Sequence, residues 1–470
     1  MKQVDNRYDF IVIGGGSAGY AAARTAKELG ARVAVVDSAD ELGGLCILRG
    51  CMPSKTLIYS AEVLHLAQQG KVFGFEDRKL RADLAAMQQR KKEIIAEFAN
   101  YRSGQLQDGR FSLFRSKAKF LDAYTLELTD GKRLHADRFI LATGSQIAMP
   151  PITGLDQVTF KTSDDVLELS EIPEEVVVLG GGIVACELAQ FLNRIGSKVT
   201  LLQRSDRILK DFPQQASVFV RENFEKEGMI VKTGVSIGAL EQINEQTIRI
   251  DFLHDGKKES LETTFLFHAL GRTPSTDGLN LEAIGVELED SGHVRANAFQ
   301  QSSLPHIYAA GDCTGPHEIV HVAIRQGETA AAHALGQSPE PISYDHLLGV
   351  VFTDPQVATV GLLPAELEKR GIEFLSADYP FDDHGKSILM EAKHGYVAVH
   401  ADKKTGVVLG AECVGKDAGE LIQALSVAVS LQATVHQLAK ADWYHPTLSE
   451  IWTYPIEDLA EEISEGFQKK

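Results

Sequence analysis

The sequence contains few cysteines and no long apolar segment. Its 470 residues include five cysteines, an odd number, whereas a secreted disulfide framework uses many cysteines in pairs. No stretch reaches the roughly 18 apolar residues that a membrane-spanning helix needs. The first residues, MKQVDNRYDF, contain no apolar signal core. These absences predict a cytoplasmic protein without a membrane span.

Basic residues are in the minority. Lysine and arginine number 47 against 65 acidic residues, for a net charge of −18. Because this average field repels a phosphate backbone, we expect no nucleic-acid partner, while a local basic site for a small phosphorylated cofactor stays compatible with it. The 44% hydrophobic and 24% charged residues are typical of a globular protein. At about 150 residues per domain, the length indicates roughly three domains.

A glycine-rich loop follows the first apolar run of the chain. Gly14, Gly16 and Gly19 have the spacing G-x-G-x-x-G, and the sequence after them predicts a helix to Leu29 and a second buried strand that ends at Asp37. Such glycines let the backbone approach a pyrophosphate at a helix N-terminus, and the acid accepts hydrogen bonds from a ribose. This segment therefore predicts a dinucleotide site.

The same arrangement recurs 166 residues later. A predicted strand over 176–179 leads into Gly180, Gly182 and Ala185, which give G-x-G-x-x-A, and a helix and a strand over 198–202 follow. Two such units predict two dinucleotides on one chain, and one can pass electrons to the other only where both reach a shared site. Simple dehydrogenases need one unit.

Cys46 and Cys51 lie between these units at a spacing of five residues. In a regular helix their Cα atoms would be about 8.6 Å apart, and a disulfide tolerates about 7 Å. The pair can bridge only where the backbone is distorted, which Gly50 permits, and Pro53 suits the first turn of a following helix. We interpret the pair as redox-active. The remaining cysteines are expected to be buried apolar residues: Cys186, Cys313 and Cys413.

The combination resembles the flavoprotein disulfide reductases, the class I pyridine nucleotide-disulfide oxidoreductase family, and is most similar in motif pattern to dihydrolipoamide dehydrogenase. The segments that carry the resemblance are 43–55 with the cysteines, 142–145 (ATGS), 308–312 (YAAGD) and 445–450 (HPTLSE). The resemblance implies an α/β fold with two Rossmann-like domains plus a C-terminal α+β dimerisation domain. The implied boundaries are 1–150 and 276–345 for FAD, 151–275 for NAD(P), and 346–470 for dimerisation.

The resemblance also implies residue roles. Cys46 would meet the substrate, Cys51 would lie beside the flavin, and His445, held by Glu450, would be the acid/base. A histidine suits this role because a thiol attacks disulfides only as the thiolate. The family is a homodimer in which His445 faces the partner's cysteines. The expected cofactor-binding residues are Gly14, Gly16, Gly19, Asp37, Lys55, Gly144, Gly180, Gly182, Glu187, Gln203, Arg204, Gly271 and Asp312, with Lys55 and Glu187 as an ion pair near flavin N5. We predict no metal site.

Coenzyme choice depends on the end of the second nucleotide strand. An acid there selects NAD, and basic residues favour the 2′-phosphate of NADP. The chain has Gln203 in place of the acid, followed by Arg204 and Lys210. This favours NADPH, with NADH as the alternative.

The predicted function is electron transfer between NAD(P)H and a disulfide or dithiol of lipoyl type. The alternatives are NADPH-dependent reduction of another small disulfide, a flavin-only transhydrogenase or quinone reductase, and a non-catalytic redox sensor or docking subunit. Bulky Trp443 and Tyr444 precede His445, where relatives of this family usually have smaller residues or another histidine. No cysteine follows Cys413, so the C-terminal cysteine pair of mercuric reductase has no counterpart here.

Overall fold

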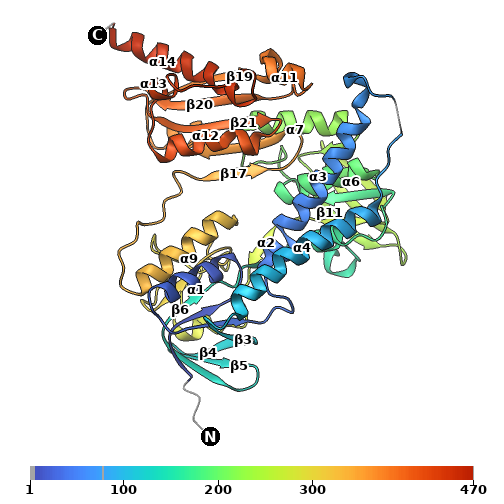
Figure 1. Ribbon diagram of the computed structural model, residues 1–470. Coiled ribbons are helices and arrows are strands. Elements are labelled where there is room, and N and C mark those ends of the chain that lie inside the picture. Colours follow the sequence, from blue (N-terminus) through green and yellow to red (C-terminus); the bar gives the residue numbers. More distant parts are fainter. Residues whose placement is uncertain (1–5, 77–78, 469–470) are drawn as a thin grey trace. The chain divides into compact units, whose positions relative to one another are not determined.

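The computed structural model describes residues 6–76 and 79–468 and has an α/β fold (Figure 1). Its internal contacts divide the chain into two compact units, and each is described by itself. Unit 1 comprises Met1–Pro150, Lys161–Glu171 and Leu270–Ile342, and unit 2 comprises Pro151–Phe160, Ile172–Ala269 and Ser343–Lys470. The three domain boundaries inferred from the resemblance stay a prediction.

Unit 1 is built on a seven-stranded sheet in the order β3-β2-β1-β6-β5-β4. The first half of β6 pairs with β5, and its second half pairs with β16. The strands β3, β2, β1, β6 and β16 are parallel, whereas β4 and β5 are antiparallel additions. The strand bounds are β1 (Arg7–Ile13), β2 (Val33–Asp37), β3 (Ser112–Arg115), β4 (Ala118–Asp122), β5 (Thr125–Leu128), β6 (Arg133–Leu141) and β16 (Ile307–Ala309).

Parallel strands at the centre of a sheet are covered on both faces, so they read as continuous apolar runs. The segment FIVI of β1 is fully buried in this way. On one face, α1 (Ser17–Glu28) packs against α9 (Val320–Ala334). The two helices touch closely, because a Cβ at Gly327 would lie 2.3 Å from the carbonyl oxygen of Ala18. The further helices of unit 1 are α2 (Gly44–Arg49), α3 (Cys51–Gln68), α4 (Leu84–Gln107), α5 (Ser163–Leu167) and α8 (Leu281–Ile284).

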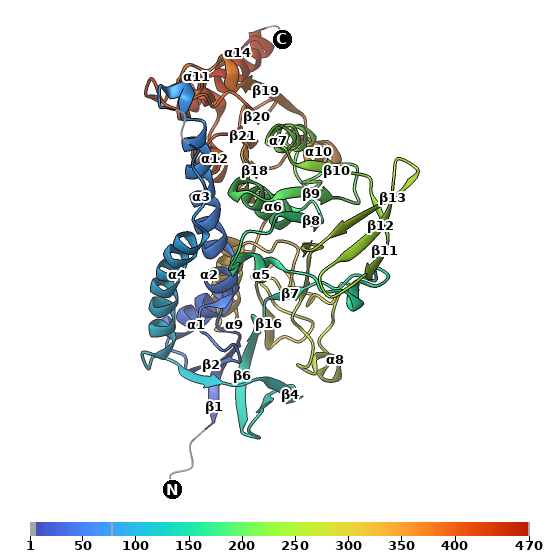
Figure 2. The same cartoon turned by 90° about the vertical axis from the view of Figure 1, so that its right-hand side faces the viewer.

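Unit 2 contains a second parallel sheet, in the order β10-β9-β8-β14. The strand–glycine loop–helix order of the first sheet is repeated here by β8, Gly180–Gly182 and α6. A three-stranded antiparallel sheet β11-β12-β13 follows in the chain (Figure 2). The bounds are β8 (Glu175–Leu179), α6 (Ile183–Ile195), β9 (Lys198–Leu202), α7 (Gln214–Lys226), β10 (Ile230–Lys232), β11 (Ser236–Gln242), β12 (Ile248–His254), β13 (Lys257–Thr263) and β14 (Leu266–His268).

The C-terminal part of unit 2 is an antiparallel five-stranded sheet in the order β17-β18-β21-β20-β19. One face of this sheet shares a core with α12 and α14, at the centre of which Trp452 is fully buried. The bounds are β17 (Leu348–Val351), β18 (Gln356–Gly361), β19 (Phe374–Pro380), β20 (Tyr396–Asp402), β21 (Val408–Gly415), α12 (Ala418–Ser430) and α14 (Thr453–Gln468). The predicted fold class, with two Rossmann-like sheets and a C-terminal α+β part, is confirmed.

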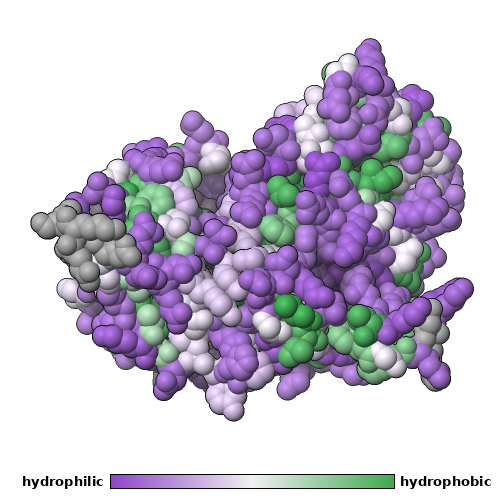
Figure 3. All heavy atoms as spheres, turned by 90° about the horizontal axis from the view of Figure 1, so that it is seen from above, coloured by the Kyte–Doolittle hydropathy of each residue, from purple (hydrophilic) through white to green (hydrophobic). Residues whose placement is uncertain are grey.

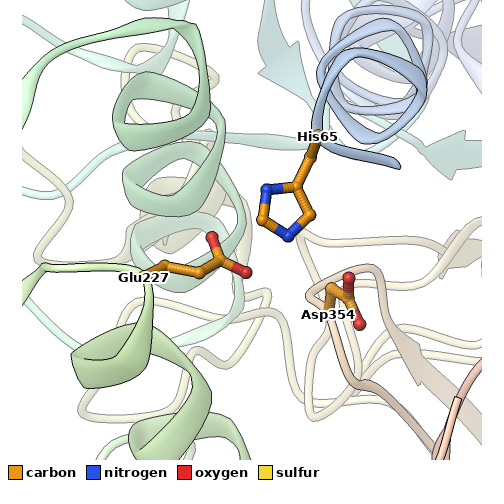
Figure 4. A group of neighbouring side chains, drawn as sticks. All are labelled: His65, Glu227 and Asp354. Carbon is orange, nitrogen blue, oxygen red and sulfur yellow. The ribbon is translucent and has the colours of Figure 1, made fainter. Parts of the chain in front are cut away.

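A buried ion-pair network joins helix α6 of the parallel part of unit 2 to the segment before β18 of the five-stranded sheet. Arg194 on α6 contacts a carboxylate oxygen of Glu227 and one of Asp354, each at 2.6 Å, and its side chain is 5% exposed. These two acids are drawn in Figure 4, whose third residue, His65, belongs to unit 1. Because the carboxylates neutralise Arg194 away from water, the network ties the segment before β18 to α6.

The remaining elements are short. They are η1 (Gly70–Phe73), β7 (Ser145–Ile147), η2 (Leu155–Gln157), β15 (Arg272–Pro274), α10 (Pro364–Lys369), η3 (Phe381–Asp383), α11 (Gly385–Leu389), α13 (Val435–Leu438) and η4 (Ser449–Trp452). Hydrophilic residues cover most of the face drawn in Figure 3. Among the described residues, no helix combines the length and apolar character that crossing a bilayer requires.

Candidate functional site

The first glycine loop connects β1 to α1 and is pressed against neighbouring backbone. A Cβ at Gly14, whose φ is +103°, would lie 2.2 Å from the carbonyl oxygen of Ala142. A Cβ at Gly19 would lie 1.8 Å from the carbonyl oxygen of Gly14. Both positions therefore exclude any larger residue, as the spacing of the glycines predicts.

We expect Gly19→Ala to destabilise unit 1 and to reduce its dinucleotide content. Overpacking of this kind costs about 1–3 kcal/mol, and the backbone shift would fall on the loop itself. The measurements are the melting temperature and the flavin bound per chain after purification. Gly104→Ala is the matched control, because Gly104 also lies within a helix but has nothing within 4 Å of its added Cβ. We expect the control to raise the free energy of unfolding by about 0.5–1 kcal/mol. An equal loss of stability in both variants would contradict the proposed crowding at Gly19.

The start of α1 is free to receive a phosphate. Its N-cap, Gly16, offers no side-chain cap, and its first turn has no acidic residue. Asp37, the last residue of β2, accepts the backbone N–H of Gly15 at 2.7 Å and that of Ala39 at 2.8 Å. Each carboxylate oxygen keeps acceptor capacity for a ribose hydroxyl. A glycine loop, an uncapped helix N-terminus and an adjoining carboxylate fit the adenosine and pyrophosphate of a dinucleotide.

A second polar cluster of unit 1 contains residues that the sequence motifs only partly indicated. Asp312 accepts the hydroxyl hydrogen of Ser145 at 2.7 Å. Arg272 donates to the Ser145 hydroxyl oxygen at 2.7 Å and to its carbonyl oxygen at 2.8 Å. Gly144, with φ +71°, precedes this serine. The structure thus brings Gly144 and Asp312 together, and it adds Arg272, which no local pattern marks.

The redox-pair candidates lie at a break between two helices of unit 1. Cys46 is inside α2, Cys51 is the first residue of α3, and Gly50 lies between the helices with φ −132° and ψ −117°. The distortion predicted from the five-residue spacing is therefore present. A Cβ at Gly50 would lie 2.9 Å from the carbonyl oxygen of Leu45 and 3.2 Å from the Cα of Cys46, so any larger residue would have to shift this backbone.

Cys46 and Cys51 are not joined by a disulfide in this structure, and their thiols interact with each other. The hydrogen bond with Cys51 and burial raise the pKa of Cys46 well above its usual value, and the charge of Lys55 opposes this. Since the thiolate is the attacking form, the pair needs a base to remove the proton. The other cysteines are fully buried, as expected, and burial raises their pKa values: Cys186, Cys313 and Cys413.

Helix α2, which carries Cys46, begins in contact with the first glycine loop. A Cβ at Gly44, the first residue of α2, would lie 2.6 Å from the Cα of Gly16. Gly16 is also the N-cap of α1. Unit 1 therefore places the segment that carries Cys46 beside the backbone expected to hold the pyrophosphate.

The second glycine loop is equally constrained. A Cβ at Gly180 would lie 2.3 Å from the carbonyl oxygen of Ala269, whereas Gly182 has open space around it and is the uncapped N-cap of α6. The side chain of Gln203 packs over Gly181, with its Cγ 2.9 Å from an added Cβ there. This geometry again fits a pyrophosphate at a helix N-terminus.

The basic residues after β9 differ in how they are engaged. Arg207 donates to the carbonyl oxygens of Phe212, at 3.0 Å, and Lys210, at 2.6 Å, and so closes its own loop. Arg204 is exposed, and the described part of the chain offers it no hydrogen bond or ion pair. Of these arginines, Arg204 is the one available to a phosphate.

Three other predicted residues are placed as follows. Glu187 on α6 is 3% exposed and accepts the backbone N–H of Phe352 at 2.8 Å. Lys55 lies on α3 of unit 1, so its pairing with Glu187 of unit 2 stays a prediction. Gly271, with φ +105°, lies in unit 1, and its carbonyl oxygen accepts the N–H of Ala148 at 3.1 Å.

The acid/base candidate is held by its predicted partner. Nδ1 of His445 donates to the two carboxylate oxygens of Glu450 at 3.0 and 2.9 Å. The His445 side chain is 79% exposed, whereas that of Glu450 is 11% exposed. Because Nδ1 carries the hydrogen in this bond, Nε2 is left on the open side to accept a proton.

A second histidine, missed from the sequence, faces the same carboxylate. His384 is fully buried, and its Nε2 lies 3.4 Å from Oε1 of Glu450. Burial lowers the pKa of His384, an effect that Glu450 opposes. His384 lies 61 residues before His445, and no motif around it predicts that it approaches Glu450.

Comparison with known proteins agrees with this geometry. Residues 8–327 match the family model described as pyridine nucleotide-disulphide oxidoreductase, and residues 348–455 match the dimerisation domain of that family. The chain is 35% identical to a mercuric reductase of Lysinibacillus sphaericus, covering 95% of this chain and 81% of the relative. It is 33% identical to a dihydrolipoyl dehydrogenase of Thermus scotoductus, covering 94% and 95%. The crystal structure of LpdA from Mycobacterium tuberculosis superposes with a TM-score of 0.86 at 27% identity, covering 96% and 99%.

Proposed function

The chain belongs to the pyridine nucleotide-disulphide oxidoreductase family, and from that premise we propose that it uses NADPH to reduce a small disulfide through Cys46 and Cys51. It is an FAD-dependent oxidoreductase that uses NAD(P)H, and it carries the dimerisation domain of the family. The choice of NADPH, the disulfide substrate, the homodimer and the residue roles belong to the proposal. The cytoplasmic location stays a prediction from the sequence.

One observation carries the proposal: the redox-pair segment starts on the dinucleotide loop. A Cβ at Gly44 would lie 2.6 Å from the Cα of Gly16, so no side chain fits at Gly44. Cys46 follows two residues after Gly44, and Cys51 begins the next helix. When bound, FAD supplies the two-electron transfer between nicotinamide and thiols that no side chain can perform.

In this proposal, Cys46, Cys51 and His445 have different roles in thiol–disulfide exchange. The Cys46 thiolate attacks the substrate disulfide, which forms a mixed disulfide and releases one thiol. Cys51 attacks the Cys46 sulfur, which releases the second thiol and leaves the Cys46–Cys51 disulfide. His445 takes the proton from the attacking thiol and returns it to the leaving one, while Glu450 orients the imidazole. NADPH gives up a hydride, which amounts to two electrons and one proton, and these together with one further proton from solvent restore the dithiol.

The experiment is a steady-state panel that crosses NADPH and NADH with lipoamide, glutathione disulfide and small aromatic disulfides. We expect turnover of at least one disulfide with NADPH. Hg²⁺ is included because relatives are named mercuric reductases and thiolates bind soft metals. NADPH-dependent reduction of Hg²⁺ alone, or of quinones alone, would overturn the proposed substrate class.

Arg204→Ala is expected to raise the KM for NADPH by about tenfold or more and to leave that for NADH unchanged. The reason is the loss of a charge-assisted hydrogen bond, worth about 1.5–3 kcal/mol, to the 2′-phosphate. Arg249→Ala is the control, since this arginine is on β12 and pairs with Glu241. An unchanged ratio of the two KM values would remove the basis for NADPH.

A further inference from the structure

Glu450 is contacted from two sides by imidazole rings. On the exposed side, Nδ1 of His445 donates to its carboxylate. On the buried side, Nε2 of His384 lies 3.4 Å from Oε1, and the His384 side chain is 0% exposed. His384 is the residue between η3 and α11, so it reaches Glu450 from a segment 66 residues earlier in the chain.

The partners of His384 determine which of its nitrogens carries the hydrogen. The approach of Nε2 to Glu450 at 3.4 Å is not a hydrogen bond, but a carboxylate attracts only a nitrogen that carries a hydrogen, so we assign the hydrogen to Nε2. Nδ1 of the neutral ring is then an acceptor, and it lies 2.8 Å from the hydroxyl oxygen of Ser387, which is fully buried. The serine hydroxyl therefore donates to Nδ1 and holds the tautomer that presents Nε2–H to Glu450.

We propose that His384 is a positioning residue for the acid/base pair. Its buried Nε2 has no hydrogen-bond partner among the described residues and faces the Glu450 carboxylate at 3.4 Å. Attraction between this N–H and the carboxylate limits rotation of the carboxylate, so that the carboxylate holds His445 in one orientation. The inference rests on the proposed disulfide chemistry of His445. A carboxylate bound on one side only can rotate, and the imidazole that it orients rotates with it. Positioning by a second partner is the arrangement that supports catalytic and metal-binding histidines elsewhere.

The other titratable groups near His384 lie on η3, β19 and α14. The ring of Tyr454 on α14 is 6.3 Å from that of His384 and stacks on Tyr379 of β19 at 3.8 Å. The Tyr379 hydroxyl donates to Asp383 at 2.9 Å, and burial together with this carboxylate raises the pKa of Tyr379. The second aspartate of η3, Asp382, is exposed. Burial lowers the pKa of His384 itself. A neutral His384 does not compete with His445 as the positively charged partner of the Glu450 carboxylate.

The test compares His384→Phe with His384→Gln in the holoenzyme. Phenylalanine keeps the ring without a donor, whereas glutamine can place an N–H near the position of Nε2. We expect His384→Phe to lower kcat/KM for the disulfide about tenfold and to move the acid limb of its pH profile to lower pH by about half a unit, because a carboxylate free to rotate supports the protonated imidazole less. His384→Gln should keep most of the unmodified kcat/KM and most of the unmodified position of the acid limb. Flavin reduction by NADPH in the absence of disulfide should be unchanged in either variant.

His400→Phe is the matched control. His400 is 2% exposed and is bonded to Ser376 at 2.8 Å and Glu412 at 3.2 Å, but its partners are not those of His445. It should alter stability without moving the pH profile. Adding His384→Phe to Glu450→Gln should have little further effect, since the two act as one unit.

The outcomes separate the two proposals. Disulfide turnover with an unmoved pH profile in His384→Phe, or additive effects with Glu450→Gln, overturns the positioning role and leaves the proposed function intact. Absence of any disulfide turnover in the unmodified protein overturns the proposed function itself. Equal losses in His384→Phe and His384→Gln would show a packing role only.

Discussion

Replacing Cys51 with serine is expected to abolish the long-wavelength absorption that a thiolate produces beside an oxidised flavin. Anaerobic titration of the unmodified holoenzyme with one equivalent of NADPH should generate this band. Cys51 begins α3, so the partial positive charge of a helix N-terminus stabilises its thiolate. Without this sulfur the electrons stay on the flavin, which should simply bleach, and disulfide turnover should fall to background.

Cys46→Ser is the matched variant with a different expected spectrum. It keeps the thiol of Cys51 and removes the hydrogen-bonded neighbour that the structure places beside it. We expect the band to persist without NADPH, because Cys51 can no longer be oxidised to the intramolecular disulfide. Turnover should be lost in both variants. If the unmodified protein only bleaches its flavin, or if Cys51→Ser retains the band, the thiol relay is wrong.

His445→Gln should lower kcat for disulfide reduction by about 10²–10⁴-fold, the usual contribution of a general acid–base. Reduction of the flavin by NADPH should be unaffected, since that step needs neither the imidazole nor the substrate thiol. The physical reason is the raised pKa of Cys46, whose burial and hydrogen bond to Cys51 keep it protonated until a base acts. Rapid mixing with NADPH, and then with disulfide, measures the two half-reactions separately.

A mixed dimer tests where His445 acts. Its side chain is 79% exposed, and the resemblance implies that it faces the cysteines of the partner subunit. Random mixing of Cys46→Ser and His445→Gln chains should then restore about a quarter of the unmodified activity, because half of the dimers are mixed and each contains one intact site. If each site used the histidine of its own chain, mixing would restore nothing. The unmixed variants, each inactive, are the controls.

Much of this molecule could be predicted because its signals are local. A strand, a glycine loop and a helix follow one another within about 30 residues in each nucleotide-binding segment. The crowding at Gly19 involves the backbone of Gly14 in the same loop, whereas the crowding at Gly14 and Gly180 involves the distant carbonyl oxygens of Ala142 and Ala269. The break between Cys46 and Cys51 is local too, since five residues of helix geometry already require it. The spacing of the glycines and the helix break depend on bond geometry and short-range contacts.

The long-range features could not be predicted in the same way. The strand order of the antiparallel five-stranded sheet depends on which apolar faces pack best. The sequences of β17 and β19 do not indicate which strands they pair with. The bonds of Arg272 to Ser145 join residues 127 positions apart. Ser145 belongs to the ATGS segment, but no pattern in the sequence marks Arg272 as its partner.

The sequence by itself determined the two dinucleotide loops, the cysteine pair with its distorted backbone, and the family that these motifs together indicate. Only the tertiary structure decided that Gly44 rests on Gly16 and that a buried His384 faces Glu450 behind His445. The physical reason is range. Motifs record what neighbouring residues need in order to fold locally, whereas a contact between distant side chains exists only after the packing of the core has brought them to the same place.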